Sequence, residues 1–136
     1  MSGHAAFGWI NLVLGGTMAV GSQTFLAPCV HEDGSFGSCH WAGQMMLGLG
    51  ILLCVLALCS LLARQPAGRA GLYLAQGLAG ALGFLVPGTL IALCGMHSMR
   101  CRAIMQPGMR ILCAATILMG IVGGVLEWRK AKRGQA

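Results

Sequence analysis

The chain of 136 residues is 57% hydrophobic and only 9% charged, with nine Lys or Arg, three Asp or Glu, and a formal net charge of +6. A soluble domain carries roughly a quarter charged residues, because its surface must face water. So few charged side chains cannot cover such a surface, and the composition excludes a water-soluble domain. Nucleic-acid binding is also excluded, because little polar surface surrounds the positive charge. The sequence indicates one integral membrane domain, residues 1–136, with the lipid bilayer as its surroundings.

Four apolar stretches approach the length of about 20 residues that a membrane-spanning helix needs. They predict an all-α bundle of four transmembrane helices, arranged as two helical hairpins, at residues 5–27, 42–63, 71–94 and 110–128. A short internal repeat supports the two hairpins, since the sequence FLAP at residues 25–28 reappears as FLVP at residues 84–87. Pro87 removes a backbone donor and clashes one turn back. The third stretch is therefore either one kinked helix or a shorter helix followed by a re-entrant cap.

Lys and Arg residues in short loops predict the orientation, because cytoplasmic loops of membrane proteins carry an excess of them. The loop at residues 64–70 holds two arginines, and the tail after Trp128 holds four basic residues. The loop at residues 28–41 holds none. We therefore expect both termini in the cytoplasm (N-in/C-in), with outer loops at residues 28–41 and 95–109.

Two arginines, Arg100 and Arg102, lie on the outer side of this arrangement. The facing outer loop holds two acidic residues, Glu32 and Asp33. We expect ion pairs between these groups, which would fold the two outer loops together and explain why the arginines lie outside.

Four of the seven cysteines fall in the predicted outer loops, namely Cys29, Cys39, Cys94 and Cys101. Thiols that meet on an oxidising face form disulfides most simply. We expect a Cys-rich extracytoplasmic cap with one disulfide inside each loop, although four cysteines allow three connectivities. The other three cysteines lie in predicted helices, where a thiol usually behaves as a small hydrophobic group.

Histidines and methionines accompany the outer-loop cysteines, at His31, His40, Met96, His97 and Met99. Thiolate, imidazole and thioether groups bind soft or borderline metals, and Met with Cys favours Cu(I). A metal or haem site on the outer face is therefore an alternative to purely structural disulfides. A third interpretation is thiol–disulfide exchange through Cys94 and Cys101, which the absence of a CxxC motif weakens. No catalytic residues are predicted.

Small residues recur at helical spacing in the third and fourth stretches, at Ala75, Ala79, Gly83, Gly120 and Gly124. Such spacing allows helix backbones to approach closely in a bilayer. We expect these positions to pack helices together, either within the subunit or against partner helices.

The sequence resembles a family of small bacterial four-helix membrane proteins of unknown function. The resemblance rests on Pro28-Cys29, Cys39-His40 and the run CGMHSMRCR at residues 94–102, and it extends over nearly the whole chain. It implies an association with ABC-type permeases and iron uptake in the cytoplasmic (inner) membrane. It assigns no catalytic residue.

We therefore expect a non-catalytic accessory subunit of a larger transport assembly, linked to iron or copper handling. The expected partners are permease-type membrane subunits or further copies of this chain, and no nucleic acid. A resident cofactor is not expected under this hypothesis. A metal ion or haem would be bound under the alternative of an extracytoplasmic metal protein, and neither under the thiol–disulfide alternative.

Overall fold

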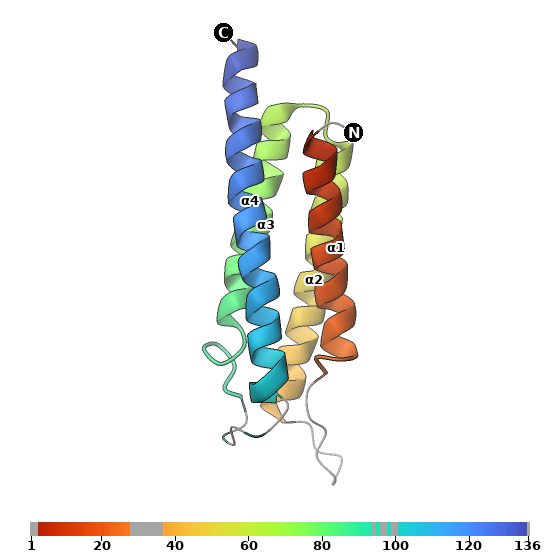
Figure 1. The fold of residues 1–136 in the computed structure, drawn as a ribbon, viewed down its shortest axis with the longest axis vertical. Helices are drawn as coiled ribbons and strands as arrows, with labels where there is room; N and C mark the ends of the chain where they lie inside the picture. Colours follow the sequence, from red (N-terminus) through yellow and green to blue (C-terminus); the bar gives the residue numbers. More distant parts are fainter. Residues whose placement is uncertain (1–2, 28–36, 94, 96–97, 99–100, 136) are drawn as a thin grey trace.

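The computed structural model describes residues 3–27, 37–93, 95, 98 and 101–135, and it consists of four long helices (Figure 1). The described residues contain no strand, so the predicted all-α class is confirmed. The elements in chain order are α1 (Gly3–Gln23), α2 (Ser38–Leu62), α3 (Pro66–Leu85), the π-helical turn η1 (Cys101–Met105) and α4 (Gln106–Gln135).

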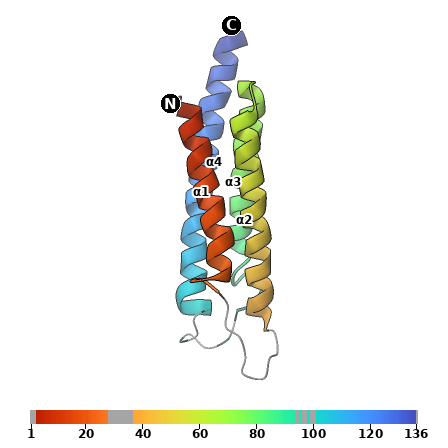
Figure 2. The same cartoon turned by 90° about the vertical axis from the view of Figure 1, so that its right-hand side faces the viewer.

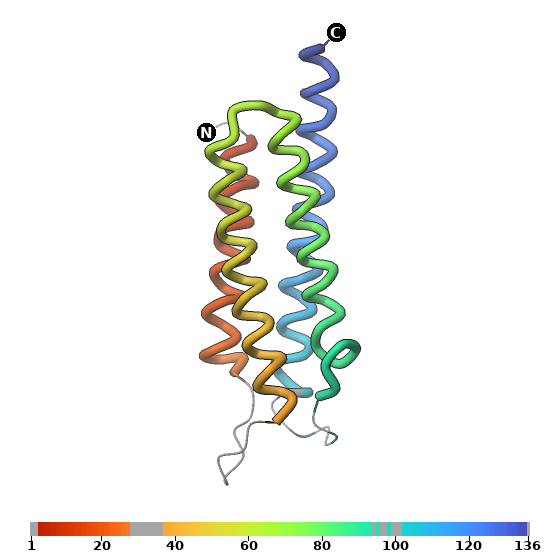
Figure 3. Tube along the Cα trace, turned by 180° about the vertical axis from the view of Figure 1, so that it is seen from behind, coloured from red at the N-terminus to blue at the C-terminus, as the bar shows by residue number. Residues whose placement is uncertain are grey.

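The helices form two hairpins, because α1 packs mainly on α2 and α3 mainly on α4. Contacts of α2 with α3 and of α1 with α4 join the two pairs along the bundle, which is elongated in both views (Figures 1 and 2). The start of α1, the connection at residues 63–65 and the end of α4 lie at one end of the bundle, here called the terminal end (Figure 3). The segments that follow α1 and α3 lie at the other end, here called the loop end.

Glycines set the close approach within each hairpin. A Cβ atom placed on Gly120 of α4 would lie 2.6 Å from the backbone nitrogen of Gly77 in α3. A Cβ atom on Gly50 of α2 would lie 2.6 Å from the backbone nitrogen of Ala19 in α1. Because real Cβ atoms do not approach backbone this closely, both contacts require glycine at the closer position.

The small residues singled out in the sequence lie along the α3–α4 hairpin. Gly83, Gly120 and Gly124 are buried, and Ala75 and Ala79 are half-buried. Gly120 lies against Gly77, and a Cβ atom on Gly83 would lie 2.9 Å from the Cys113 sulfur of α4. The buried positions among them therefore pack α3 and α4 together within the chain.

The third helix covers residues 66–85 rather than the expected 71–94. It starts earlier because Pro66 occupies its first turn, where a missing N–H costs nothing. It ends before Pro87, and the chain then turns through Gly88, whose φ of 93° suits glycine. The N–H of Gly88 donates to the carbonyl of Ile91 at 3.0 Å. The proline thus ends the helix instead of kinking it.

Three helical segments are long and apolar enough to cross a membrane, namely α1, α2 and the segment Arg102–Gln135 that contains α4. The last of these extends well beyond the expected residues 110–128, because the basic residues after Trp128 continue as helix. α3 is not among the three: Arg69 and Gln76 both lie within it and lower its mean hydropathy.

Candidate functional site

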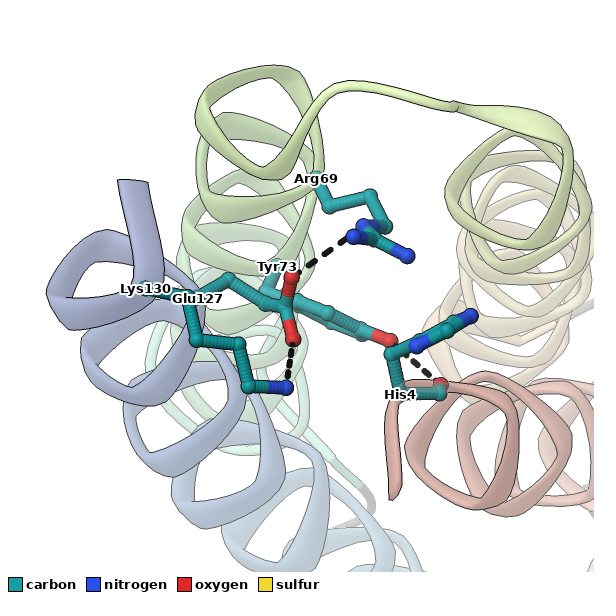
Figure 4. A network of polar contacts seen from close by, with 5 residues as sticks. All are labelled: His4, Arg69, Tyr73, Glu127 and Lys130. Atoms are coloured by element: carbon teal, nitrogen blue, oxygen red, sulfur yellow. Dashed lines mark hydrogen bonds and ion pairs between the residues drawn. The ribbon is translucent and has the colours of Figure 1, made fainter. Parts of the chain in front are cut away.

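A buried charged cluster lies at the terminal end between α3 and α4 (Figure 4). Glu127 of α4 is only 2% exposed, and one carboxylate oxygen, Oε2, lies 3.1 Å from Arg69 Nε of α3. The other oxygen, Oε1, accepts a hydrogen bond from Lys130 Nζ at 2.7 Å. The Arg69 side chain is 12% exposed, whereas that of Lys130 is 52% exposed. Arg69 is therefore the buried counter-ion of Glu127, whereas Lys130 pairs with Glu127 from the exposed side of the cluster.

Tyr73 connects this cluster to the other hairpin. Its ring is fully buried, and its hydroxyl donates a hydrogen bond to the backbone carbonyl of His4 in α1 at 3.0 Å. The ring also lies edge-on to Phe7, with 6.4 Å between the ring centroids. Gly123 of α4 leaves room for the ring, since a Cβ atom there would lie 3.1 Å from it. Figure 4 shows Tyr73 reaching from beside Glu127 across to His4.

These five residues, His4, Arg69, Tyr73, Glu127 and Lys130, are here called the terminal-end network. From the sequence, Arg69 is expected in the loop at residues 64–70, and no pairing with Glu127 is predicted. Two signals pointed to the pair: a carboxylate in an otherwise apolar helix needs a partner, and Arg69 and Tyr73 are one turn apart on one helix face. The network joins α1, α3 and α4, so its geometry suits a structural role.

Two buried carboxamides lie next to this network. Asn11 of α1 follows Phe7 by one turn, and Gln76 of α3 follows Tyr73 by about one turn. Both side chains are at most 2% exposed, and the structure shows no hydrogen-bond partner for the nitrogen or the oxygen of either. Buried amide groups cost free energy unless they are hydrogen-bonded, and water commonly supplies the bonds. The core is therefore polar in this layer.

Half of the ten buried residues in the hydrophobic core cluster carry sulfur, and they lie toward the loop end. Five side chains of one buried cluster are at most 1% exposed and carry sulfur, namely Met18, Met46, Met105, Met109 and Cys113. They come from α1, α2, η1 and α4, and are here called the sulfur core. A Cβ atom on Gly83 would lie 2.9 Å from Cys113 Sγ and 3.7 Å from Met46 Cε. The thiol of Cys113 in α4 and the terminal methyl group of Met46 in α2 thus both lie near Gly83 of α3.

The sulfur core can act in two ways. Methionine is flexible and fills irregular gaps in hydrophobic cores. Thioether and thiol groups are also the soft ligands that select Cu(I). The sequence draws attention to the loop methionines but does not predict this cluster. A helix that is apolar on all sides over most of its length, such as α2, has no periodicity that marks its inner face.

Most residues of the predicted outer-loop site lie outside the described part of the chain. These are Cys29, His31, Glu32, Asp33, Cys94, Met96, His97, Met99 and Arg100, and of Cys101 only the backbone is described. The disulfides, the ion pairs and the loop metal site therefore stay predictions.

Three predicted outer-loop residues are described. Cys39 is buried in the first turn of α2, and His40 is half-buried with its ring 5.7 Å from that of Trp41. Arg102 is exposed in η1. Among the described residues, no three His, Cys, Asp or Glu side chains gather to hold a metal ion.

The helical architecture and the three long apolar segments define a multi-pass membrane protein. The family described as Domain of unknown function (DUF4418) matches residues 11–126, and the chain belongs to this family. The expected membership of a family of unknown function is thereby confirmed. No curated protein and no solved structure matches the chain.

Proposed function

We propose that this chain is a non-catalytic accessory subunit of a metal-transport assembly in a bacterial cytoplasmic membrane, and that it holds a soft metal ion, Cu(I) foremost. The observation that carries the proposal is the sulfur core, which lies at the end of the bundle where the Cys-, His- and Met-rich loops emerge. An ABC-type permease is the partner that the family resemblance favours.

The arrangement of α3 supports its role as a fourth membrane-spanning helix. Its polar side chains Arg69, Tyr73 and Gln76 are directed into the bundle, whereas Leu74 and Leu78 are 48% and 73% exposed. Mean hydropathy counts both faces, but the bilayer contacts only the outer face. Twenty residues of helix extend about 30 Å, the thickness of the hydrocarbon layer. These two properties support a four-pass bundle.

Charge supports a cytoplasmic terminal end. Basic side chains gather at this end, from the connection after α2 and from the last turns of α4, namely Arg64, Arg129, Lys130, Lys132 and Arg133. Cytoplasmic segments carry such an excess. The loop end, and with it the sulfur core, then lies in the extracytoplasmic half of the bundle.

The two ends of the bundle differ in their chemistry, and this difference suits an accessory subunit that passes a metal ion to a partner. At the loop end, sulfur-containing side chains from several helices belong to one buried core, and such soft groups favour Cu(I) over harder ions. At the terminal end, Tyr73 and the Arg69–Glu127 pair join α1, α3 and α4 across the interior. A metal ion that enters from the outer loops would therefore be held and handed to a partner rather than carried across by this chain.

Metal binding by the sulfur core is tested with Ag(I), a redox-stable stand-in for Cu(I), titrated into the purified protein in detergent. We expect Met46→Leu/Met109→Leu to weaken Ag(I) binding by tenfold or more. Leu replaces Met with little change in volume, so the fold should persist. Met45→Leu is the matched control, because Met45 is the neighbouring residue but is 43% exposed. Its Ag(I) affinity should equal that of the wild type.

Two outcomes would contradict this assignment. Unchanged Ag(I) affinity in the Met46→Leu/Met109→Leu variant would leave the sulfur core as packing alone. Loss of binding in Met96→Leu/Met99→Leu, without loss in the core variant, would place the metal in the outer loop instead. The accessory role fails separately if purification in gentle detergent always yields a lone monomer and deletion of the gene leaves cellular metal uptake unchanged.

A further inference from the structure

An apolar groove runs along the outer face of the α3–α4 hairpin. It consists of two adjoining hollows of about 380 and 330 Å³ that share Leu74. Gly77 and Gly120 line the first hollow, whereas Trp128, Arg129 and Lys132 line the second. The groove is therefore apolar along its length and has two basic residues at one end, here called the cationic end.

The length of the groove corresponds to one leaflet of a bilayer. From Ile117 in the first hollow to Lys132 in the second, α4 rises about 22 Å, at about 1.5 Å per residue. Half of the hydrocarbon layer measures about 15 Å, and the headgroup region adds several more. A groove of this extent can hold one acyl chain with its headgroup at the cationic end.

Within the described part of the chain, no side-chain carboxylate is paired with the basic residues at that end of the groove. Glu127 is the one side-chain carboxylate among the described residues, and it is held by Arg69 and Lys130 on the inner face. Arg129 and Lys132 are exposed at the mouth of the groove. Two cations at the end of an apolar channel complement a phosphate group that carries an acyl chain.

We propose that this groove binds one anionic phospholipid from the leaflet on the terminal side. Its acyl chain lies over Gly77 and Gly120, and its phosphate is held by Arg129 and Lys132. The inference rests on the membrane span proposed for α3, but it is independent of the proposed metal binding.

A second copy of the chain fits the groove less well than a lipid does. Copies in one membrane share an orientation, and a two-fold interface places the same patch of each copy against the other. Arg129 and Lys132 of both copies would then meet at the same end of the interface and repel one another. An anionic lipid supplies the opposite charge.

The fluorescence of Trp128 can detect a molecule bound in the groove, because its side chain lines the groove beside Arg129 and Lys132. In a Trp9→Phe/Trp41→Phe background it is the sole tryptophan, and both replaced side chains are more than half exposed. The protein is reconstituted into phosphatidylcholine nanodiscs that contain phosphatidylglycerol with brominated acyl chains, which quench indole fluorescence. We expect half-maximal quenching at a mole fraction of brominated phosphatidylglycerol on the order of tenfold lower than that of brominated phosphatidylcholine.

Two matched double variants distinguish a specific lipid site in the groove from general attraction of anionic lipid to the basic end of the bundle. Arg129→Gln/Lys132→Gln should abolish the preference for phosphatidylglycerol. Arg64→Gln/Arg133→Gln removes the same charge at the same end, outside the groove lining, and should keep the preference. Equal quenching by both lipids, or equal loss in the two double variants, overturns the proposal. Quenching by both lipids that falls as more copies are placed in each disc would identify a second copy as the occupant.

Discussion

Glu127→Gln is expected to lower the free energy of unfolding by about 3 kcal/mol, because it leaves Arg69 charged and largely buried without its counter-ion. The carboxylate is 2% exposed and makes an ion pair with each of two side chains. Glutamine retains the shape but supplies no charge. Unfolding in detergent, followed by circular dichroism during a titration with denaturing surfactant, measures the change.

Two further variants test the cause of this loss. Lys130→Gln should cost less than about 1 kcal/mol, because a half-exposed partner contributes little. Arg69→Met/Glu127→Leu should recover most of the stability that Glu127→Gln loses, since no unpaired charge remains in the core. Equal costs for Glu127→Gln and Lys130→Gln would show that the internal pair is not the stabilising contact.

The all-α fold class and the four long helices could be predicted from the sequence, because a membrane-spanning helix needs a long apolar segment and the chain has such segments. The ends were less predictable. α3 begins at Pro66 and ends at Leu85, since proline suits a first turn and breaks a helix interior. Mean hydropathy averages both faces of α3, so it does not register that Arg69 and Gln76 face inward.

The terminal-end network and the sulfur core could not be located from the sequence alone. Arg69 and Glu127 lie on different helices, and they meet only because α3 and α4 pack closely, as at Gly77 and Gly120. The inner position of Met46, as opposed to the exposed neighbour Met45, depends on the rotation of α2 about its axis. An evenly apolar helix leaves that rotation undetermined until its neighbours are placed.

Gly120→Ala is expected to destabilise the fold by about 2 kcal/mol, whereas Gly77→Ala at the opposite side of the same contact is expected to be neutral or slightly stabilising. A Cβ atom on Gly120 would lie 2.6 Å from the nitrogen and 2.7 Å from the Cα atom of Gly77. Backbone atoms cannot move aside, so α3 and α4 must separate. A Cβ atom on Gly77 would meet nothing closer than the Cα atom of Gly120 at 3.7 Å, an ordinary contact.

The α1–α2 hairpin offers an independent check of the same physics. Gly50→Ala places a Cβ atom 2.6 Å from the backbone nitrogen of Ala19. Gly48 lies two residues away on the opposite, exposed face of the same helix, and a Cβ atom there meets nothing within 4 Å. Thermal unfolding in detergent should therefore rank Gly120→Ala and Gly50→Ala well below Gly77→Ala and Gly48→Ala. Similar stability in all four variants would mean that the helices tolerate a wider spacing. Because Gly120 also lines the outer groove, separation of α3 and α4 in Gly120→Ala should change Trp128 quenching as well.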